Sequence, residues 1–228
     1  MNSLSATSAD IGLQRFRHIV IEGPIGVGKS SLARKLAEHL KAELLLELPE
    51  ENPFLGRFYD DMPSYAFQTQ LFFLFQRAKQ MQAIAQPGMF DHAVVSDFLF
   101  AKDALFARLT LSDDEHRLYT QMYAQIAPQV GEPDLVIWLQ APPATLLQRI
   151  RKRAIRMERT IDVDYLQRLC DAYVQYFHAY DGAPVFAVGT EHFNPIERDA
   201  DFKVLLERLE NFRGRREFFN AEADSPFP

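Results

Sequence analysis

The chain has 228 residues, of which 47% are hydrophobic, enough for one α/β domain with a buried core. Asp and Glu outnumber Lys and Arg by 31 to 25, and the net charge of −6 argues against nucleic acid as the main partner. One cysteine excludes a disulfide framework or a thiolate metal cluster and fits a cytoplasmic protein. The N-terminus does not resemble a signal peptide, and no apolar run approaches the ~18 residues of a membrane span, so no membrane association is expected.

Short strand-like runs alternate with longer helical patterns across residues 15–212, while 1–14 and 213–228 are predicted to be flexible tails. The alternation predicts a single α/β domain: a five-stranded parallel sheet with helices on both faces. Ligands are then expected at the carboxyl ends of the strands. The predicted strands are 17–22, 42–47, 92–97, 134–140 and 184–188, and the predicted helices are 30–40, 63–85, 101–130, 142–153, 162–181 and 199–212.

The first strand is followed by GPIGVGKS, which matches the phosphate-binding pattern G-x-x-x-x-G-K-[ST] between a strand and a helix. Glycines let backbone N–H groups converge on phosphate oxygens, and the following helix points its positive end at them. The alternative, a glycine-rich turn that binds nothing, is disfavoured because every motif residue is present in the required context. Lys29 is expected to reach the outer phosphates and Ser30 to bind Mg²⁺. The residues expected to hold ATP are Gly23, Pro24, Ile25, Gly26, Val27, Gly28, Lys29, Ser30 and Ser31.

Two carboxylates stand at the ends of apolar runs. Asp97 ends AVVSD, where a phosphate-binding-loop protein needs a carboxylate near the metal; a helix N-cap is the alternative and is compatible with that role. Glu47 is the first polar group after LLL, and Pro49 makes continuation of the strand unfavourable. A general base is expected there. Glu50 and Glu51 are other candidates for that role, and the non-functional alternative is a solvated acidic loop.

Two segments downstream fit an acceptor site and a lid. Phe67, Gln70, Leu74 and Arg77 share one face of the helix predicted over 63–85, so an amide and a guanidinium could face a planar ligand; a core helix with both groups at its wet margin is the alternative. Residues 149–159, RIRKRAIRMER, hold six cations. Such a run is often a solvated helix face or a nucleic-acid patch. With a phosphate-binding loop in the same acidic chain, it indicates a lid at about 150–160.

Taken in order, GPIGVGKSS, ELPEENPFLGRFY, YAFQTQLFFLFQR, VVSD followed by KDALFA, and RIRKRAIRMER resemble the deoxynucleoside kinase family. The similarity runs from about residue 19 to 209 and is greatest to the bacterial deoxyguanosine/deoxyadenosine kinase branch. It implies a P-loop kinase fold and an ATP- and Mg²⁺-dependent transfer of the γ-phosphoryl group to the 5′-hydroxyl of a 2′-deoxynucleoside, in nucleotide salvage. The branch implies a purine base, and the family implies a homodimer.

The resemblance also implies roles in the transfer step. Glu47 matches the base that takes the proton of the 5′-hydroxyl, and Asp97 matches the carboxylate of the family's DRS/ERS motif, near substrate and metal. Lys29 keeps its role at the phosphates. Arg149 and Arg153 match arginines of the lid that stabilise the charge of the transferred group.

Five residues match the family's nucleoside pocket. Tyr59 and Glu158 match the pair that contacts the 3′-hydroxyl. Gln70, Arg77 and Asp103 match the three residues that read the base. An amide, a cation and a carboxylate can together read a base edge.

Two positions depart from the family pattern. Phe98 stands where many members have arginine, and Lys102 is a candidate to replace it; Ile155 stands at a lid arginine, and Arg156 is expected to compensate as a catalytic cation. A thymidylate-type nucleoside monophosphate kinase is the nearest alternative, disfavoured by the absence of that arginine at Phe98. A catalytically silent P-loop assembly protein is the second alternative, disfavoured by the intact motif residues.

Overall fold

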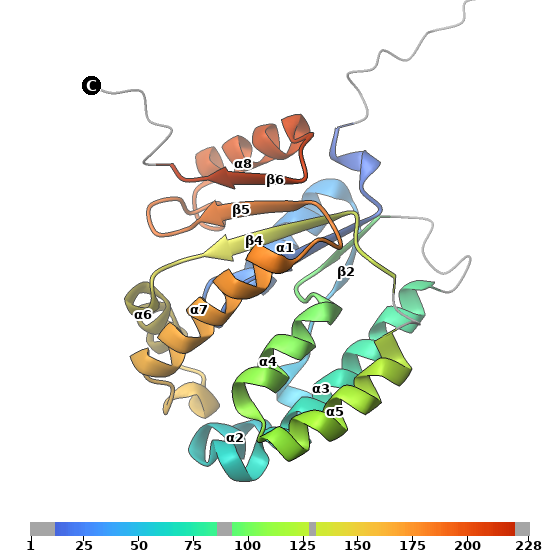
Figure 1. Cartoon of the computed structure of the whole chain (residues 1–228). Helices are drawn as coiled ribbons and strands as arrows, with labels where there is room; N and C mark the ends of the chain where they lie inside the picture. The colour runs from blue at the N-terminus through green and yellow to red at the C-terminus, as the bar shows by residue number, and fades with distance from the viewer. Residues whose placement is uncertain (1–11, 86–92, 128–130, 222–228) are drawn as a thin grey trace, which may run out of the picture.

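The computed structural model describes residues 12–85, 93–127 and 131–221, in which one parallel sheet is covered by helices on both faces (Figure 1). Its strand order is β2-β3-β1-β4-β5-β6. The helices α1 (Lys29–Leu40) and α8 (Asp199–Asn211) lie on one face, and α4 (Asp103–Thr110) and α7 (Val163–Ala179) on the other. The strands are β1 His18–Glu22, β2 Glu43–Leu45, β3 Val94–Ser96, β4 Leu135–Gln140, β5 Val185–Gly189 and β6 Arg216–Phe219.

The remaining helices build the edges of the site. Figure 1 shows α3 and α5 beside α4, at the β2 side of the sheet, and α6 next to α7. Short 3-10 helices occur at Leu13–Arg15, Pro49–Glu51, Phe100–Lys102 and Arg156–Glu158. The other α-helices are α2 Leu55–Asp60, α3 Met62–Ala85, α5 Asp113–Ile126 and α6 Pro143–Arg153.

The sheet has six strands, so the predicted five strands and the predicted tail over 213–228 need correction. Residues 216–219 form β6, parallel to β5. The Arg216 guanidinium donates to the Phe177 carbonyl at 2.7 Å, and the buried Phe219 ring meets Phe193 edge-on at 4.9 Å. Of the four residues of β6, only Phe219 is buried, so the sequence shows no alternating strand pattern and predicts a tail.

Other predicted boundaries shift for local reasons. The long helix predicted over 101–130 is divided in two because Ser112 caps α5 in a capping box with Glu115. The strand predicted over 42–47 ends at Leu45, which leaves Glu47 in a loop. The tail predicted over 1–14 ends earlier, since Leu13 is buried in a 3-10 turn. The expected tail residues 1–11 and 222–228, the start of the predicted third strand at 92, and 128–130 at the end of the long helix lie outside the described residues.

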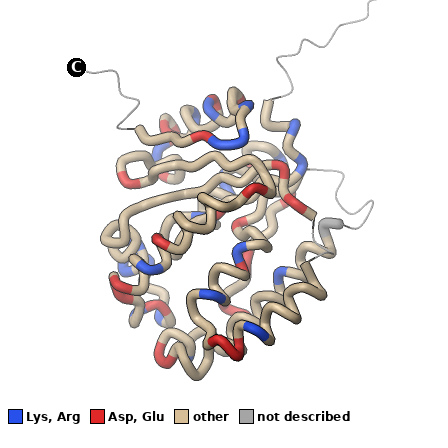
Figure 2. Tube along the Cα trace, in the orientation of Figure 1, with Lys and Arg blue, Asp and Glu red and all other residues tan. Residues whose placement is uncertain are grey.

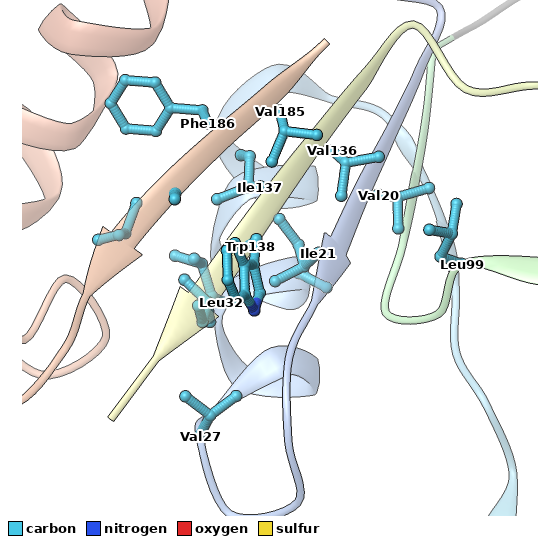
Figure 3. Packing of buried hydrophobic residues seen from close by; sticks show 14 of the residues in the cluster. Val20, Ile21, Val27, Leu32, Leu99, Val136, Ile137, Trp138, Val185 and Phe186 are labelled. Carbon is cyan, nitrogen blue, oxygen red and sulfur yellow. The ribbon is translucent and has the colours of Figure 1, made fainter. Parts of the chain in front are cut away.

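The phosphate-binding loop is anchored to the central core. Val20 and Ile21 of β1 pack with residues of β4 and β5, and Leu32 of α1 covers them (Figure 3). Val27 points from the loop into this cluster with 1% of its surface exposed. Interiors of this kind are closely packed and deform little, so the loop is carried on a rigid base.

The surface of the described residues mixes both signs of charge. Segments with Lys or Arg and segments with Asp or Glu are scattered over the whole described trace (Figure 2). Within the described ranges, no helix combines the length and the apolar character needed to cross a membrane.

Replacing Phe219 by Ala tests whether β6 belongs to the folded domain. We expect Phe219→Ala to lower the free energy of unfolding by about 3–5 kcal/mol, the usual cost of truncating a buried phenylalanine. Phe218→Ala is the matched control, because its side chain is 70% exposed, and it should cost about 1 kcal/mol or less. Urea denaturation measures both. Equal, small effects would show that 213–221 is a tail after all.

Candidate active site

The carboxyl ends of β1, β2 and β3 border a cleft of about 350 Å³. Its walls come from the phosphate-binding loop, α1, the segment after β2, α3, the end of α6 and α7. Segments far apart in the sequence therefore converge where the parallel sheet predicts a ligand. The predicted site residues that line this cleft are Ile25, Gly26, Gly28, Lys29, Ser30, Ser31, Glu47, Tyr59, Gln70, Arg77, Asp97, Arg153 and Glu158.

The phosphate-binding loop adopts a backbone that only glycine tolerates at its two ends. Gly23 has φ 148° and Gly28 has φ 105°. A Cβ on Gly23 would collide with the Leu139 carbonyl of β4, and one on Gly28 would come within 2.5 Å of the Ile196 side chain. The loop thus passes close to its neighbours, and α1 begins at Lys29 with its N-terminus toward the cleft.

Lys29 folds back over the loop. Its Nζ donates to the carbonyl oxygens of Gly23 at 2.8 Å and Pro24 at 3.3 Å. Burial, together with repulsion from Lys102, lowers the pKa of Lys29 to about 8. The Lys29 ammonium therefore already lies in the loop. A bound phosphate group would be a stronger hydrogen-bond acceptor for it than these neutral carbonyl oxygens.

Asp97 joins the two sides of the cleft. Its Oδ2 accepts a hydrogen bond from Ser30 Oγ at 2.5 Å, and its Oδ1 accepts one from the Glu47 backbone N–H at 2.7 Å. Burial raises the pKa of Asp97, and the hydrogen bond from Ser30 opposes that rise. Ser30 and Asp97, the two predicted Mg²⁺ ligands, are therefore in direct contact, and one carboxylate links the phosphate-binding helix to the loop after β2.

Glu47 faces a buried arginine across the cleft. Arg77 Nε donates to Glu47 Oε1 at 2.7 Å, and the same guanidinium forms an ion pair with Asp103. Burial alone would raise the pKa of Glu47, but Arg77, Lys102 and Lys29 outweigh burial and lower that pKa to about 2. Glu47 is consequently ionised at neutral pH, and the alternative of a solvated acidic loop does not hold for it.

The helix α3 presents Gln70 and Arg77 inward, with 3% of each exposed. The Gln70 amide lies near Thr110, with Nε2 and Oγ1 3.4 Å apart. Asp103 begins α4 and is fully buried behind Arg77. The helix is thus both core and site, because its aromatic residues pack while its amide and guanidinium line the cleft.

Two residues of the predicted lid line the cleft. Arg153 donates to Glu158 at 2.8 and 2.5 Å. Tyr59 lies beside them, and burial, followed by the neighbouring Tyr165, raises the pKa of its hydroxyl. The tyrosine remains a neutral hydrogen-bonding group at physiological pH.

Two predicted lid cations lie elsewhere. Arg149 sits in α6 behind the loop, where it donates to Thr190 Oγ1 at 3.0 Å and to the Thr190 carbonyl at 2.5 Å. Arg156 is exposed, and Ile155 takes the place at the cleft wall. Ala154 caps the C-terminus of α6 with φ 55°, in the left-handed region, and Ile155 directly after it lines the cleft. The compensation of Ile155 by Arg156 stays a prediction.

Sequence reasoning missed Glu22 and Tyr173. Glu22 is fully buried at the end of β1, and the Tyr173 hydroxyl of α7 donates to it at 2.9 Å. A carboxylate closing an apolar strand directly before the first loop glycine was a usable signal for Glu22. Tyr173 had none, because its partner is 151 residues away in the chain.

A phosphate-binding loop, a carboxylate bonded to its serine and a buried carboxylate across the same cleft define a P-loop phosphotransferase. Residues 19–213 match the family model described as deoxynucleoside kinase. The chain therefore belongs to the deoxynucleoside kinase family, which confirms the predicted class of enzyme over a nucleoside monophosphate kinase or a silent assembly protein.

Individual relatives agree with this assignment. The chain is 35% identical to a deoxyguanosine kinase of Bacillus subtilis over 68% of this chain and 75% of that one. It is 34% identical to a deoxyadenosine kinase of Dictyostelium discoideum over 70% and 66%. Among solved structures, deoxyadenosine kinase from M. mycoides with bound dATP superposes with a TM-score of 0.72 at 25% identity, covering 84% of this chain and 98% of that one.

Replacing Glu47 by Gln tests its part in catalysis. We expect Glu47→Gln to lower kcat by about 10²- to 10⁴-fold, because an amide cannot accept the hydroxyl proton, while nucleoside affinity changes little. Steady-state kinetics and calorimetric titration measure the two. Glu51→Gln, which removes an exposed carboxylate four residues away, should leave kcat unchanged. A Glu47→Gln variant within threefold of wild type would remove Glu47 from the mechanism.

The lowered pKa of Lys29 predicts a pH dependence. Its ammonium is charged below about pH 8 and loses its proton as the pH rises through that value. Since kcat/KM for ATP reports the free enzyme, it should fall above about pH 8. The Lys29→Arg variant stays charged, so its kcat/KM, though lower, should lack this alkaline limb. The same limb in both proteins would assign it to another group.

Proposed function

We propose that this protein transfers the γ-phosphoryl group of ATP to the 5′-hydroxyl of a purine 2′-deoxynucleoside. The observation that carries the proposal is the bridge through Asp97, which holds the serine of the phosphate-binding loop and the loop of Glu47 on one carboxylate. A donor site and a proton acceptor then share a single cleft at a fixed separation. In-line transfer requires this arrangement.

The donor half fits a nucleoside triphosphate with Mg²⁺. No cluster of three His, Cys, Asp or Glu able to hold a metal occurs in the part of the chain that the structure describes. Mg²⁺ does not need one, since it keeps several waters and binds through one or two carboxylates and the phosphates. Ser30 and Asp97 would hold it, and the bound ion would neutralise charge on the phosphates.

On the acceptor side of the cleft, Glu47 contributes more by orienting the 5′-hydroxyl than by acting as a strong base. A carboxylate with a pKa of about 2 is a weak base, but the transition state of phosphoryl transfer is loose and needs little proton transfer early on. Glu47 accepts the hydrogen bond of the 5′-hydroxyl, then its proton. Arg153 and Lys29 both line the cleft and supply positive charge around the transferred group.

The nucleoside would lie between α3 and the lid. Gln70 and Arg77 line the cleft as a donor and a cation for a base edge, with Asp103 paired to Arg77 behind them, and Tyr59 and Glu158 line the same cleft as candidates to contact the 3′-hydroxyl. The purine preference rests on relatives named for deoxyguanosine and for deoxyadenosine, although another relative is named for both deoxyadenosine and deoxycytidine.

Three further proposals concern its setting: a role in nucleotide salvage, a cytoplasmic location and a homodimer. The homodimer rests on the family resemblance and on the aromatic-rich helix α3, whose Phe75 is 52% exposed. The mixed surface charge does not favour a nucleic-acid partner.

Radiolabelled ATP with each of the four deoxynucleosides tests the proposed reaction. We expect deoxyguanosine or deoxyadenosine to give a kcat/KM at least about tenfold above the pyrimidines, the scale of one base-edge contact. Lys29→Met, which loses the phosphate-binding cation, controls for contaminating kinases. A preferred pyrimidine would overturn the purine assignment, and phosphorylation of the monophosphate but not of the nucleoside would overturn the reaction.

A further inference from the structure

A buried carboxylate and a buried lysine form a unit between the phosphate-binding loop and Glu47. Glu22 is fully buried and Lys102 is 2% exposed, yet Lys102 also lines the cleft. Its Nζ lies 3.4 Å from Glu22 and 3.9 Å from Glu47. The lysine thus stands between a carboxylate of the core and the carboxylate of the site.

The carboxylate of Glu22 is fully engaged. Its Oε1 accepts from the Gly23 N–H at 2.8 Å and from the Tyr173 hydroxyl at 2.9 Å, and its Oε2 accepts from the Leu99 N–H at 2.7 Å. Three short hydrogen bonds from three separate elements fix the position of Glu22. Its negative charge is therefore a stationary anchor in the core.

Lys102 is held less closely. A charge-assisted N–H···O bond is normally about 2.7–2.9 Å long, whereas the Lys102 ammonium is 3.4 Å or more from both carboxylates. An ammonium has three donors, and these contacts do not satisfy them at close range. Attraction to the two carboxylates keeps the Lys102 ammonium in place, while its N–H donors remain able to bond another oxygen in the cleft.

Phe98 cannot supply a cation at this place even if it were arginine. Its ring is fully buried in a second apolar cluster with Leu74 and Tyr119, away from the cleft. The other cations at the cleft wall near Glu47 are committed, since Arg77 pairs with Glu47 and Asp103, and Lys29 caps its own loop. Lys102, by contrast, lies beside Glu47 with no carboxylate oxygen closer than 3.4 Å to its ammonium.

We propose that Lys102 is a catalytic residue that donates a hydrogen bond to the acceptor hydroxyl oxygen, and that Glu22 is the positioning residue that holds it there. The inference rests on the proposed function. As the bond from this oxygen to phosphorus forms and the bond from phosphorus to the leaving diphosphate breaks, the hydroxyl proton passes to Glu47. The hydrogen bond from Lys102 stabilises the negative charge that the attacking oxygen gains.

Lys102→Met tests the role of the cation. We expect kcat and the single-turnover rate with deoxyguanosine and Mg-ATP to fall by about 10²- to 10³-fold, the usual effect of losing one donor to a reacting oxygen. Affinities for ATP and for deoxyguanosine should stay within about threefold. Lys79→Met, the same change at an exposed position of α3, should match wild type.

A buried Glu22 without its lysine is costly, so a second variant separates folding from catalysis. Glu22→Gln/Lys102→Met removes both charges together. We expect it to melt closer to wild type than Lys102→Met does, to bind ATP, and to remain as slow as Lys102→Met. For the positioning role, Glu22→Gln alone should lower kcat with KM unchanged.

The outcomes are distinct. A double variant that regains kcat within threefold of wild type would show that Lys102 only balances Glu22, and the proposal would be overturned. Loss of ATP binding in every variant would likewise make the pair structural and overturn it. If wild type phosphorylates no deoxynucleoside, the proposed function fails and this inference falls with it; if wild type and all variants are equally active, only the inference fails.

Discussion

The buried carboxylate of Glu22 is the constraint on which the donor side of the site depends. A charge without exposure to water is tolerated only when hydrogen bonds and a countercharge replace its hydration. Here the replacement comes from the first peptide of the phosphate-binding loop, the turn after β3, α7 and Lys102. Satisfying one carboxylate therefore fixes the loop, the neighbouring strand end and the helix that covers them.

Asp97, after the adjacent strand, is a second carboxylate that holds separate segments together through hydrogen bonds. Glu22 ends β1 and Asp97 follows the adjacent β3, so both carboxylates lie at the same edge of the sheet. Glu22 lies in the core and accepts hydrogen bonds from two backbone N–H groups. Asp97 lies at the cleft and accepts hydrogen bonds from the Ser30 hydroxyl and the Glu47 N–H. The parallel sheet makes both possible, because it brings separate strand ends to one edge.

Much of this was readable from the sequence because the signals were local. The glycine spacing of residues 23–30, the carboxylate after AVVS and the pair Gln70 and Arg77 on one helix face each depend on neighbours within a few residues. The sixth strand and the Glu22–Tyr173 contact were not readable, because a four-residue edge strand and a pairing across 151 residues leave no periodic pattern. The roles predicted for Arg149 and Arg156 stay predictions: Arg149 contacts Thr190 from α6, and Arg156 is exposed after the left-handed Ala154.

Arg77 connects recognition of the acceptor to the reactivity of Glu47. The same guanidinium that is placed to meet a base edge also contacts Glu47, and its charge is the first of the attractions that hold the pKa of Glu47 at about 2 against the opposing effect of burial. A ligand group that pairs with Arg77 would therefore contact the same guanidinium that keeps the pKa of Glu47 low. Lys102, anchored by Glu22 rather than by the ligand, keeps a positive charge beside Glu47 throughout.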